Sequence, residues 1–281
     1  MRFRTFGPTG KEVSAIGQGT WNMEEDSRGA AVEALRRGLD AGMNHVDTAE
    51  MYGDGRVEEL VGEAIEGSRG EVFLVSKVLP QNASRRGAVQ ACERSLRRLR
   101  TDYLDCYILH WAGRYPLRDT IAAFEDLCEA GKIRAWGLSN FDEEELAEAI
   151  AIAGEGRIAC NQVLYHLQER AIEHAVIPFC DEHGIAVVAY SPFGSGDFPA
   201  PQSEGGRILA DVAEAHGAMP RQIALAFLLR FSSLFAIPKA GRAEHAAENA
   251  VAVDIELSED ELCRIDEAFP RGRRRRGVPT L

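Results

Sequence analysis

Short apolar runs alternate with longer amphipathic runs along the whole chain of 281 residues. Short apolar runs bounded by turn residues are typical of buried strands, and apolar spacings of three and four residues are typical of helices. In residues 30–42, for example, Ala31, Leu35 and Leu39 share one stripe, and Gly42 follows as a helix stop. The strand-like runs are SAIGQGT, MNHVDTA, VFLVSKV, YLDCYILH, IRAWGLSN, IACNQVLY, IAVVAYSP and LFAIPKA.

Eight strands that each precede a helix predict an α/β fold in which a parallel sheet closes into a (β/α)8 TIM barrel. An open doubly wound sheet is the alternative, but it usually has fewer strands. Residues 2–14 predict an N-terminal β-hairpin with its turn at Pro8–Gly10, and residues 257–269 open with a capping box that predicts an extra C-terminal helix. No linker interrupts the chain, so we expect residues 1–281 to form a single domain.

Composition limits the class of partner. The chain carries 44 acidic against 32 basic side chains, and the net charge of −12 disfavours nucleic acid or an anionic membrane as a partner. Its six cysteines include no CxxC pair, and we expect no metal site. The chain opens without an apolar signal segment and contains no membrane-length apolar run, so the sequence predicts a cytoplasmic protein in a reducing compartment. We expect a monomer that acts on a small molecule.

Polar side chains interrupt the strand-like runs close to the point where each run ends. In a barrel the carboxyl ends of all strands open onto one face, which is the face where barrel enzymes carry out chemistry. We therefore expect these side chains to surround one site. They are Asp47, Lys77, His110, Ser139, Asn140, Gln162, Tyr190 and Lys239, with Tyr52 in the loop just after Asp47.

Four of these residues suit the protonation of an oxygen that gains negative charge. A buried Lys77 beside Asp47 stays protonated, because the ion pair offsets desolvation. Its ammonium is expected to lower the pKa of Tyr52 from about 10 toward neutrality, which predicts a general acid usable near pH 7. His110 can orient a substrate oxygen through a hydrogen bond. The set lacks the activated nucleophile of acyl transfer and the second carboxylate of a glycosidase, so a carbonyl that accepts hydride fits better.

The same residues lie in segments that carry a family resemblance. The segments are GQGTW, DTAEMYG, VSK, LHW, GLSNF, NQVLY, AYSPFGSG and IPKAGRAEHAAEN, in this order. Together they resemble the aldo-keto reductases, from the first strand to the end of the chain. The resemblance implies a barrel that binds NADPH across its C-terminal face and reduces aldehydes or ketones to alcohols.

The resemblance also implies a role for each matching residue. Tyr52 is the general acid, Lys77 and Asp47 tune it, and His110 orients the carbonyl oxygen. The nicotinamide carboxamide is held by Ser139, Asn140 and Gln162, and its ring stacks on Tyr190. The other cofactor contacts it implies are Gly19, Thr20, Ser191, Pro192, Phe193, Ser195, Lys239, Ala240, Arg242, His245, Glu248 and Asn249.

Two tryptophans, Trp21 and Trp111, occupy positions where the family lines an apolar substrate mouth. Ordinary barrel packing is the alternative role for both. The run Arg273–Arg276 is expected to be a solvated tail, and a second possibility is that this tail folds over the site.

One segment departs from the family pattern. After the lysine the family usually has a small hydroxyl residue, and six residues after the lysine an arginine; both commonly bind the 2′-phosphate of NADPH. Here Ala240 and His245 occupy these positions, and a neutral imidazole is a poor phosphate partner. Arg242 could supply the contact instead. We expect NADPH to be preferred and NADH to be accepted more readily than is usual in the family.

Two functions of other classes remain open at this point. One is an NADPH-binding regulatory or sensor barrel with little turnover, and the other is a barrel lyase or hydrolase without redox chemistry. The first is distinguished by NADPH binding without oxidation on any aldehyde, and the second by the absence of NADPH binding.

Overall fold

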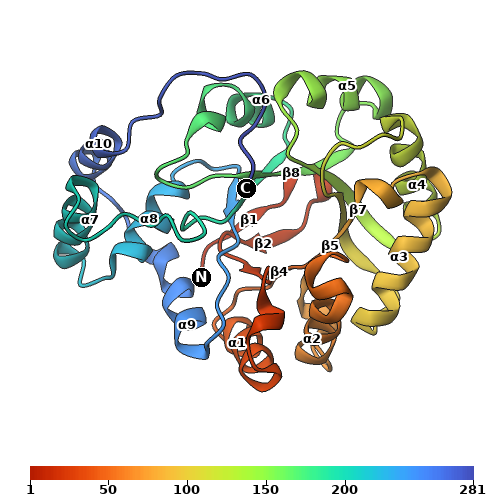
Figure 1. Cartoon of the computed structure of the whole chain (residues 1–281), viewed down its shortest axis with the longest axis horizontal. Helices are drawn as coiled ribbons and strands as arrows, with labels where there is room; N and C mark the ends of the chain where they lie inside the picture. The colour runs from red at the N-terminus through yellow and green to blue at the C-terminus, as the bar shows by residue number, and fades with distance from the viewer.

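A closed barrel of eight parallel strands forms the centre of the computed structural model, which describes residues 1–281 (Figure 1). The strands follow one another around the sheet in chain order, and the first meets the last. At this seam Gly17 donates its backbone N–H to the Ala236 carbonyl at 2.8 Å. The predicted TIM barrel is therefore confirmed, and the open sheet is excluded. The strands are β3 (Gln18–Gly19), β4 (His45–Asp47), β5 (Phe73–Val78), β6 (Leu104–Leu109), β7 (Ile133–Ser139), β8 (Ile158–Leu164), β9 (Ala186–Tyr190) and β10 (Leu234–Ala236).

The seam requires a glycine at its upper end. A Cβ atom built on Gly19 would lie 2.4 Å from the carbonyl oxygen of Ile237, which is closer than real Cβ contacts. Gly19 donates its N–H to the Pro238 carbonyl at 3.2 Å. Any side chain at this position would push the two strands apart and open the barrel.

Helices cover the outside of the barrel. The connection between β9 and β10 contains two helices, α7 (Glu204–Ala215) and α8 (Pro220–Leu228), where the sequence pattern indicated one. In Figure 1 α7 and α10 lie outermost on one side, with α8 between α7 and the barrel. None of the helices is long and apolar enough to cross a membrane. The helices are α1 (Arg28–Asp40), α2 (Arg56–Ala64), α3 (Arg85–Leu99), α4 (Leu117–Glu129), α5 (Glu143–Ala153), α6 (Val176–Glu182), α7 (Glu204–Ala215), α8 (Pro220–Leu228), α9 (Ala243–Val251) and α10 (Glu259–Ala268).

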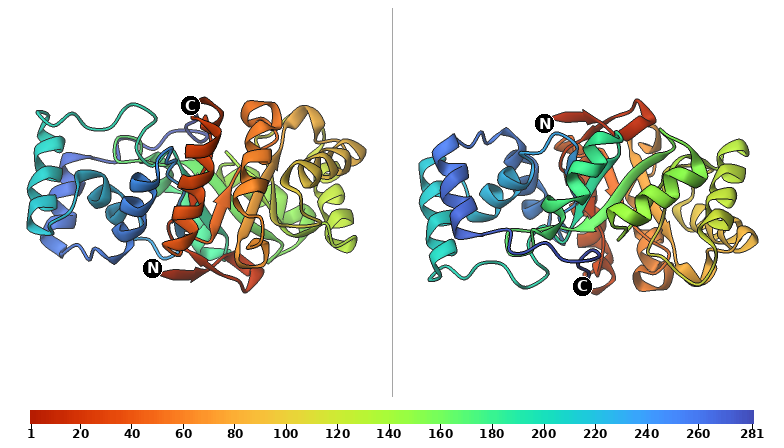
Figure 2. Two further views of the ribbon diagram at one scale, coloured as in Figure 1. Left: turned by 90° about the horizontal axis from the view of Figure 1, so that it is seen from below. Right: turned by 90° about the horizontal axis from the view of Figure 1, so that it is seen from above.

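Both additions to the barrel lie where the sequence places them. The N-terminal hairpin pairs β1 (Phe3–Thr5) with β2 (Glu12–Ser14), and its turn ends at Gly10 in the left-handed region (φ 66°). Helix α10 begins after Ser258, whose hydroxyl accepts a hydrogen bond from the Glu261 N–H at 3.3 Å. Figure 2 shows the hairpin and the C-terminal end of the chain on opposite faces of the barrel. The hairpin therefore leaves the face with the strand carboxyl ends open.

A buried histidine lies among aromatic rings contributed by the hairpin and the barrel strands. The ring of His45 lies 5.6 Å from that of Phe6, 5.8 Å from that of Phe73 and 6.3 Å from that of Phe235, measured between centroids. Neither of its ring nitrogens has a hydrogen-bond partner. Burial lowers the pKa of His45 to about 4, so the ring is neutral at physiological pH.

This histidine makes the barrel sensitive to acid. The unfolded chain protonates His45 below about pH 6.5, whereas the folded protein does so only near pH 4. The free energy of unfolding therefore falls between these two values, by about 3 kcal/mol from this group. We expect His45→Leu to remove that part of the loss. Urea unfolding of both proteins at pH 7 and pH 4.5 measures it, and an equal loss in the two proteins would contradict the assignment.

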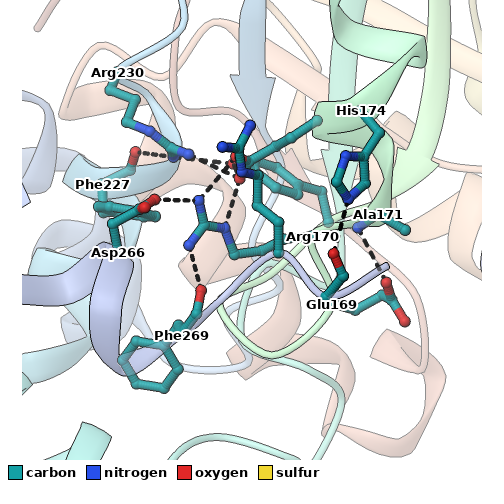
Figure 3. A network of polar contacts seen from close by, with 12 residues as sticks. Glu169, Arg170, Ala171, His174, Phe227, Arg230, Asp266 and Phe269 are labelled. Carbon is teal, nitrogen blue, oxygen red and sulfur yellow. Dashed lines mark hydrogen bonds and ion pairs between the residues drawn. The ribbon is translucent and has the colours of Figure 1, made fainter. Parts of the chain in front are cut away.

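A buried ionic cluster attaches the last helix to the barrel (Figure 3). Arg170, in the loop before α6, donates to Glu173 at 2.7 and 2.8 Å, to Asp266 of α10 at 2.5 Å and to the Phe269 carbonyl. Arg230 donates to the same Glu173 carboxylate at 2.8 Å. Burial by itself would raise the pKa of Glu173, but the donors around it lower that pKa to about 2. The cluster fixes the point from which the C-terminal tail leaves α10.

Candidate active site

Lys77 makes three hydrogen bonds at the carboxyl end of the barrel. This fully buried side chain on β5 donates from Nζ to Asp47 Oδ1 at 2.5 Å, to the Thr48 carbonyl at 2.8 Å and to Tyr52 Oη at 3.2 Å. Burial would lower the pKa of Lys77, but Asp47 and Tyr52 raise it above its usual value. The lysine is therefore an ammonium that holds a carboxylate and a phenol together.

Local backbone structure brings the phenol back to the strand it follows. The chain leaves β4 at Asp47 and enters a 3₁₀ turn over Tyr52–Gly55. Gly55 has φ 89°, a left-handed conformation that favours glycine, and α2 begins immediately after it. The turn thus places the Tyr52 hydroxyl against Lys77 of the neighbouring strand.

The expected fall in the pKa of Tyr52 toward neutrality is wrong. Burial raises this pKa above its usual value, and the opposing effect of the Lys77 ammonium is smaller. Asp47 adds to the rise, since its negative charge disfavours a phenolate. The phenol is consequently protonated throughout the neutral range, with its proton available to an acceptor more basic than a phenolate.

His110 follows β6 and lies beside Tyr52. The two rings meet edge to face, with centroids 5.9 Å apart and an interplanar angle of 75°. Burial, and then the charge of Lys77, lowers the pKa of His110 to about 3. Its Nδ1 is buried without a partner. The ring is therefore a neutral imidazole, which can donate one N–H to an oxygen but carries no charge of its own.

A cavity of about 590 Å³ opens above these residues. Tyr52 and His110 line it, together with both tryptophans of the predicted substrate mouth, Trp21 and Trp111. About a third of each tryptophan is exposed (38% and 36%), so neither is a core residue. This volume is in the range of sites for small-molecule ligands.

The C-terminal tail forms part of the wall of this cavity. Arg274 pairs with Glu143 at 2.5 Å and Arg275 with Glu169 at 3.4 Å, while the arginine side chains remain exposed. Beyond them, Val278 and the other residues near the chain end line the cavity. The tail thus combines the two alternatives that its sequence left open: solvated arginines and a segment that folds over the site.

The residues predicted to hold the nicotinamide line the same cavity, and they also bond to one another. Gln162 donates from Nε2 to Asp47 Oδ2 at 2.8 Å, so the carboxylate is held by two donors. Asn140 donates to the His110 carbonyl at 3.2 Å and accepts from the Tyr190 hydroxyl at 3.0 Å. These bonds fix the strand-end side chains relative to one another. The predicted set that lines this cavity is Ser139, Asn140, Gln162 and Tyr190.

Two further cavities continue from the first one and form a groove. The second, of about 390 Å³, shares Trp21, Tyr52 and Tyr190 with the first. The third, of about 330 Å³, shares Lys239 with the second. Of the predicted cofactor residues, the second cavity is lined by Gly19, Thr20, Tyr190, Ser191, Pro192, Phe193, Ser195 and Lys239, and the third by Phe193, Lys239, His245, Glu248 and Asn249.

Two predicted cofactor residues, Ala240 and Arg242, line none of these three cavities. The Arg242 guanidinium contacts His245 Nε2 instead. Lys239 lines the groove, but its ammonium forms an ion pair with Asp26 at 2.5 Å. Of the side chains that the sequence offered for a phosphate, Lys239 is therefore paired with a carboxylate, and Arg242 and His245 contact each other.

Sequence reasoning missed two side chains that line both the second and the third cavity, Arg221 and Phe198. Arg221 lies in the first turn of α8, inside a run that reads as an ordinary amphipathic helix. No local signal marks it, because only the packing of α8 against the loop after β9 brings it to the groove.

The fold and the site define a TIM barrel with a hydrogen-bonded cluster of Asp47, Lys77 and Tyr52 at the carboxyl ends of its strands and a long groove beside it. The profile of the Aldo/keto reductase family matches residues 15–269. The chain belongs to this family and is an oxidoreductase.

Relatives of known name extend over nearly the whole chain. Methylglyoxal reductase YeaE of Escherichia coli is 45% identical over 92% of this chain and 92% of its own length. Glyoxal reductase of Bacillus subtilis is 34% identical over 92% of this chain and 89% of its own. An aldo/keto reductase of Klebsiella pneumoniae, solved in complex with NADP and acetate, has a TM-score of 0.93 and 43% identity, with full coverage of both chains.

Proposed function

We propose that the protein reduces aldehyde or ketone carbonyls to alcohols with NADPH. The observation that carries the proposal is the phenol of Tyr52, which is hydrogen-bonded to a buried ammonium and lines a ligand-sized cavity beside a neutral His110. When bound, NADPH would supply the hydride to the carbonyl carbon. The protein's own part is to place the carbonyl oxygen and to provide its proton.

The proton would come from Tyr52. As hydride reaches the carbon, the oxygen becomes an alkoxide, which is far more basic than a phenolate, so the raised pKa of Tyr52 does not prevent the transfer. Lys77 would stabilise the phenolate that remains, and Asp47 would keep Lys77 charged and in place. His110, being neutral, would donate a hydrogen bond to the same oxygen without competing as an acid.

The groove has the chemistry that a nicotinamide dinucleotide needs. Asn140 and Gln162 present amide groups, and Ser139 a hydroxyl, in the cavity that Tyr52 lines. These groups match the donors and acceptors of a carboxamide, and the Tyr190 ring offers an apolar face beside them. NADPH is the expected cofactor, and the NADP-bound relative supports this choice.

The cavity suits a small carbonyl substrate. Its volume of about 590 Å³ is shared between the substrate and the nicotinamide end of the cofactor, with Trp21 and Trp111 as the apolar walls of the substrate part. The names of two relatives, a methylglyoxal reductase and a glyoxal reductase, support small dicarbonyl compounds as the first substrates to try.

A substrate screen tests the proposal. We expect absorbance measurements to show NADPH oxidation with methylglyoxal, glyoxal or aromatic aldehydes, and weaker oxidation with sugars. NADPH binding, followed by fluorescence quenching, should be observed in the same preparation. Binding without oxidation on any of these substrates would contradict reductase activity and favour the regulatory barrel. Absence of NADPH binding would contradict both.

We further propose that residues 1–281 act as one domain and as a monomer in the cytoplasm. All six cysteines are free, and four of them are buried in the core, which supports a reducing compartment. Burial raises the pKa of the Cys92 thiol to about 12 and of the Cys128 thiol to about 11, so both resist oxidation. Sedimentation at micromolar concentration measures the oligomeric state.

A further inference from the structure

One cation of the cofactor groove has no ionic partner in the protein. Arg221 lies in the first turn of α8 and lines both the second and the third cavity. Its guanidinium carbon lies 5.3 Å from the ring centroid of Phe193 and 5.4 Å from that of Phe198. Both rings belong to the loop after β9, and they pack edge to face with centroids 6.0 Å apart. The loop and the helix thus hold a guanidinium at the groove without neutralising its charge.

The neighbouring side chains that could bind an anion differ from Arg221 either in their contacts or in their position. Lys239 is paired with Asp26 at 2.5 Å. His245 faces the third cavity, but its Nε2 is in contact with the Arg242 guanidinium and accepts from it, so this nitrogen is not free to donate to an anion. Arg242 itself lies outside the three cavities. The third cavity therefore contains one uncommitted guanidinium, that of Arg221.

We propose that Arg221 binds the 2′-phosphate of NADPH and determines the preference of this protein for NADPH over NADH. The inference rests on the proposed function, since it assigns one more residue to the same cofactor. In this chain Ala240 and His245 stand where the family commonly has a hydroxyl residue and an arginine that bind this phosphate. The guanidinium of Arg221 presents several N–H donors in a fixed geometry, and these can bind the phosphate in their place. Glu248 and Asn249 line the same cavity and supply polar groups for the adenine edge.

The position also allows a different contact, which makes the proposal testable. A guanidinium that stacked on the adenine ring would contribute equally to NADPH and NADH, because the two share that ring. A guanidinium that binds the 2′-phosphate contributes to NADPH alone. The ratio of the two dissociation constants therefore separates the two contacts.

The experiment measures Kd for NADPH and for NADH by fluorescence quenching in the wild type and in the variants Arg221→Ala, Arg221→Lys, Arg242→Ala and Arg207→Ala. Arg207 is an exposed residue of α7 outside the groove, so its replacement controls for the change in net charge. We expect Arg221→Ala to raise the Kd for NADPH roughly 10- to 100-fold, the loss typical of a charge-assisted hydrogen bond. The Kd for NADH should stay within about twofold of the wild type. Arg221→Lys keeps the positive charge but loses the bidentate geometry of the guanidinium. Its Kd for NADPH should therefore lie between those of the wild type and Arg221→Ala.

Three results would overturn the assignment. An equal loss for both dinucleotides would indicate stacking on the adenine or contact with the pyrophosphate. No loss for either would place Arg221 outside the cofactor site. A selective loss of NADPH affinity in Arg242→Ala, with Arg221→Ala unaffected, would assign the phosphate to Arg242. A wild-type protein that bound neither dinucleotide would instead overturn the proposed function itself, so the two failures are distinguishable.

Discussion

Replacing Tyr52 with phenylalanine is expected to reduce kcat for carbonyl reduction by about 10²- to 10⁴-fold, the range attributed to a general acid. The variant lacks the one proton donor that is both hydrogen-bonded to Lys77 and exposed to the cavity. The fold should survive, because Lys77 keeps its bonds to Asp47 and to the Thr48 carbonyl. Steady-state kinetics with methylglyoxal measures the loss.

Two controls accompany the Tyr52→Phe variant. The Kd for NADPH should change by less than about twofold, since the hydroxyl is assigned to the substrate and not to the cofactor. In the wild type, the raised pKa of Tyr52 predicts that the acid form persists as pH rises through the neutral range, so reduction should show no alkaline decline there from this group. A Tyr52→Phe protein with near-normal kcat would show that another group supplies the proton.

Replacing Lys77 with methionine should impair both catalysis and stability. The Asp47 carboxylate would remain buried with only Gln162 as a side-chain donor. Breaking a buried ion pair in this way costs about 3–5 kcal/mol of the free energy of unfolding. The kcat should also fall, because the phenolate left after proton transfer loses its ammonium. Urea unfolding and steady-state kinetics measure the two effects.

The double variant Asp47→Asn, Lys77→Met separates these effects. It removes both charges, so much of the lost stability should return, since no buried charge is left alone. Activity should stay low, because neither residue can then assist Tyr52. If the double variant regained kcat as well as stability, the ion pair would have a structural role alone.

The barrel and the positions of its strand-end residues could be predicted from the sequence for a physical reason. The strands are buried on both sides, so each is a short apolar run, and a polar residue such as Asp47 or Gln162 stands out against it. Because the strands are parallel, their carboxyl ends must meet on one face. The family resemblance then added roles to residues that the pattern had already placed together.

The pKa of Tyr52 could not be predicted in the same way. The prediction from sequence considered the charge of Lys77 next to the phenol. It did not include the loss of hydration when folding buries the phenol. Desolvation depends on the packing of the whole turn, so it becomes visible only in three dimensions. The same limit explains Arg221, which reaches the groove because α8 packs against Phe193 and Phe198, two residues that lie more than twenty positions earlier in the chain.

Residues of the C-terminal tail can change the shape of the substrate cavity with little effect on the stability of the barrel. Val278 and its neighbours form part of the cavity wall, yet the arginines that hold this segment make exposed ion pairs, with Glu143 and Glu169, which contribute little to folding. Substitutions in the tail can therefore reshape the space above Tyr52 while the strands and the Arg170 cluster stay intact. For evolution, as for a designer of new reductases, the last residues are a region where substrate range can change without endangering the fold.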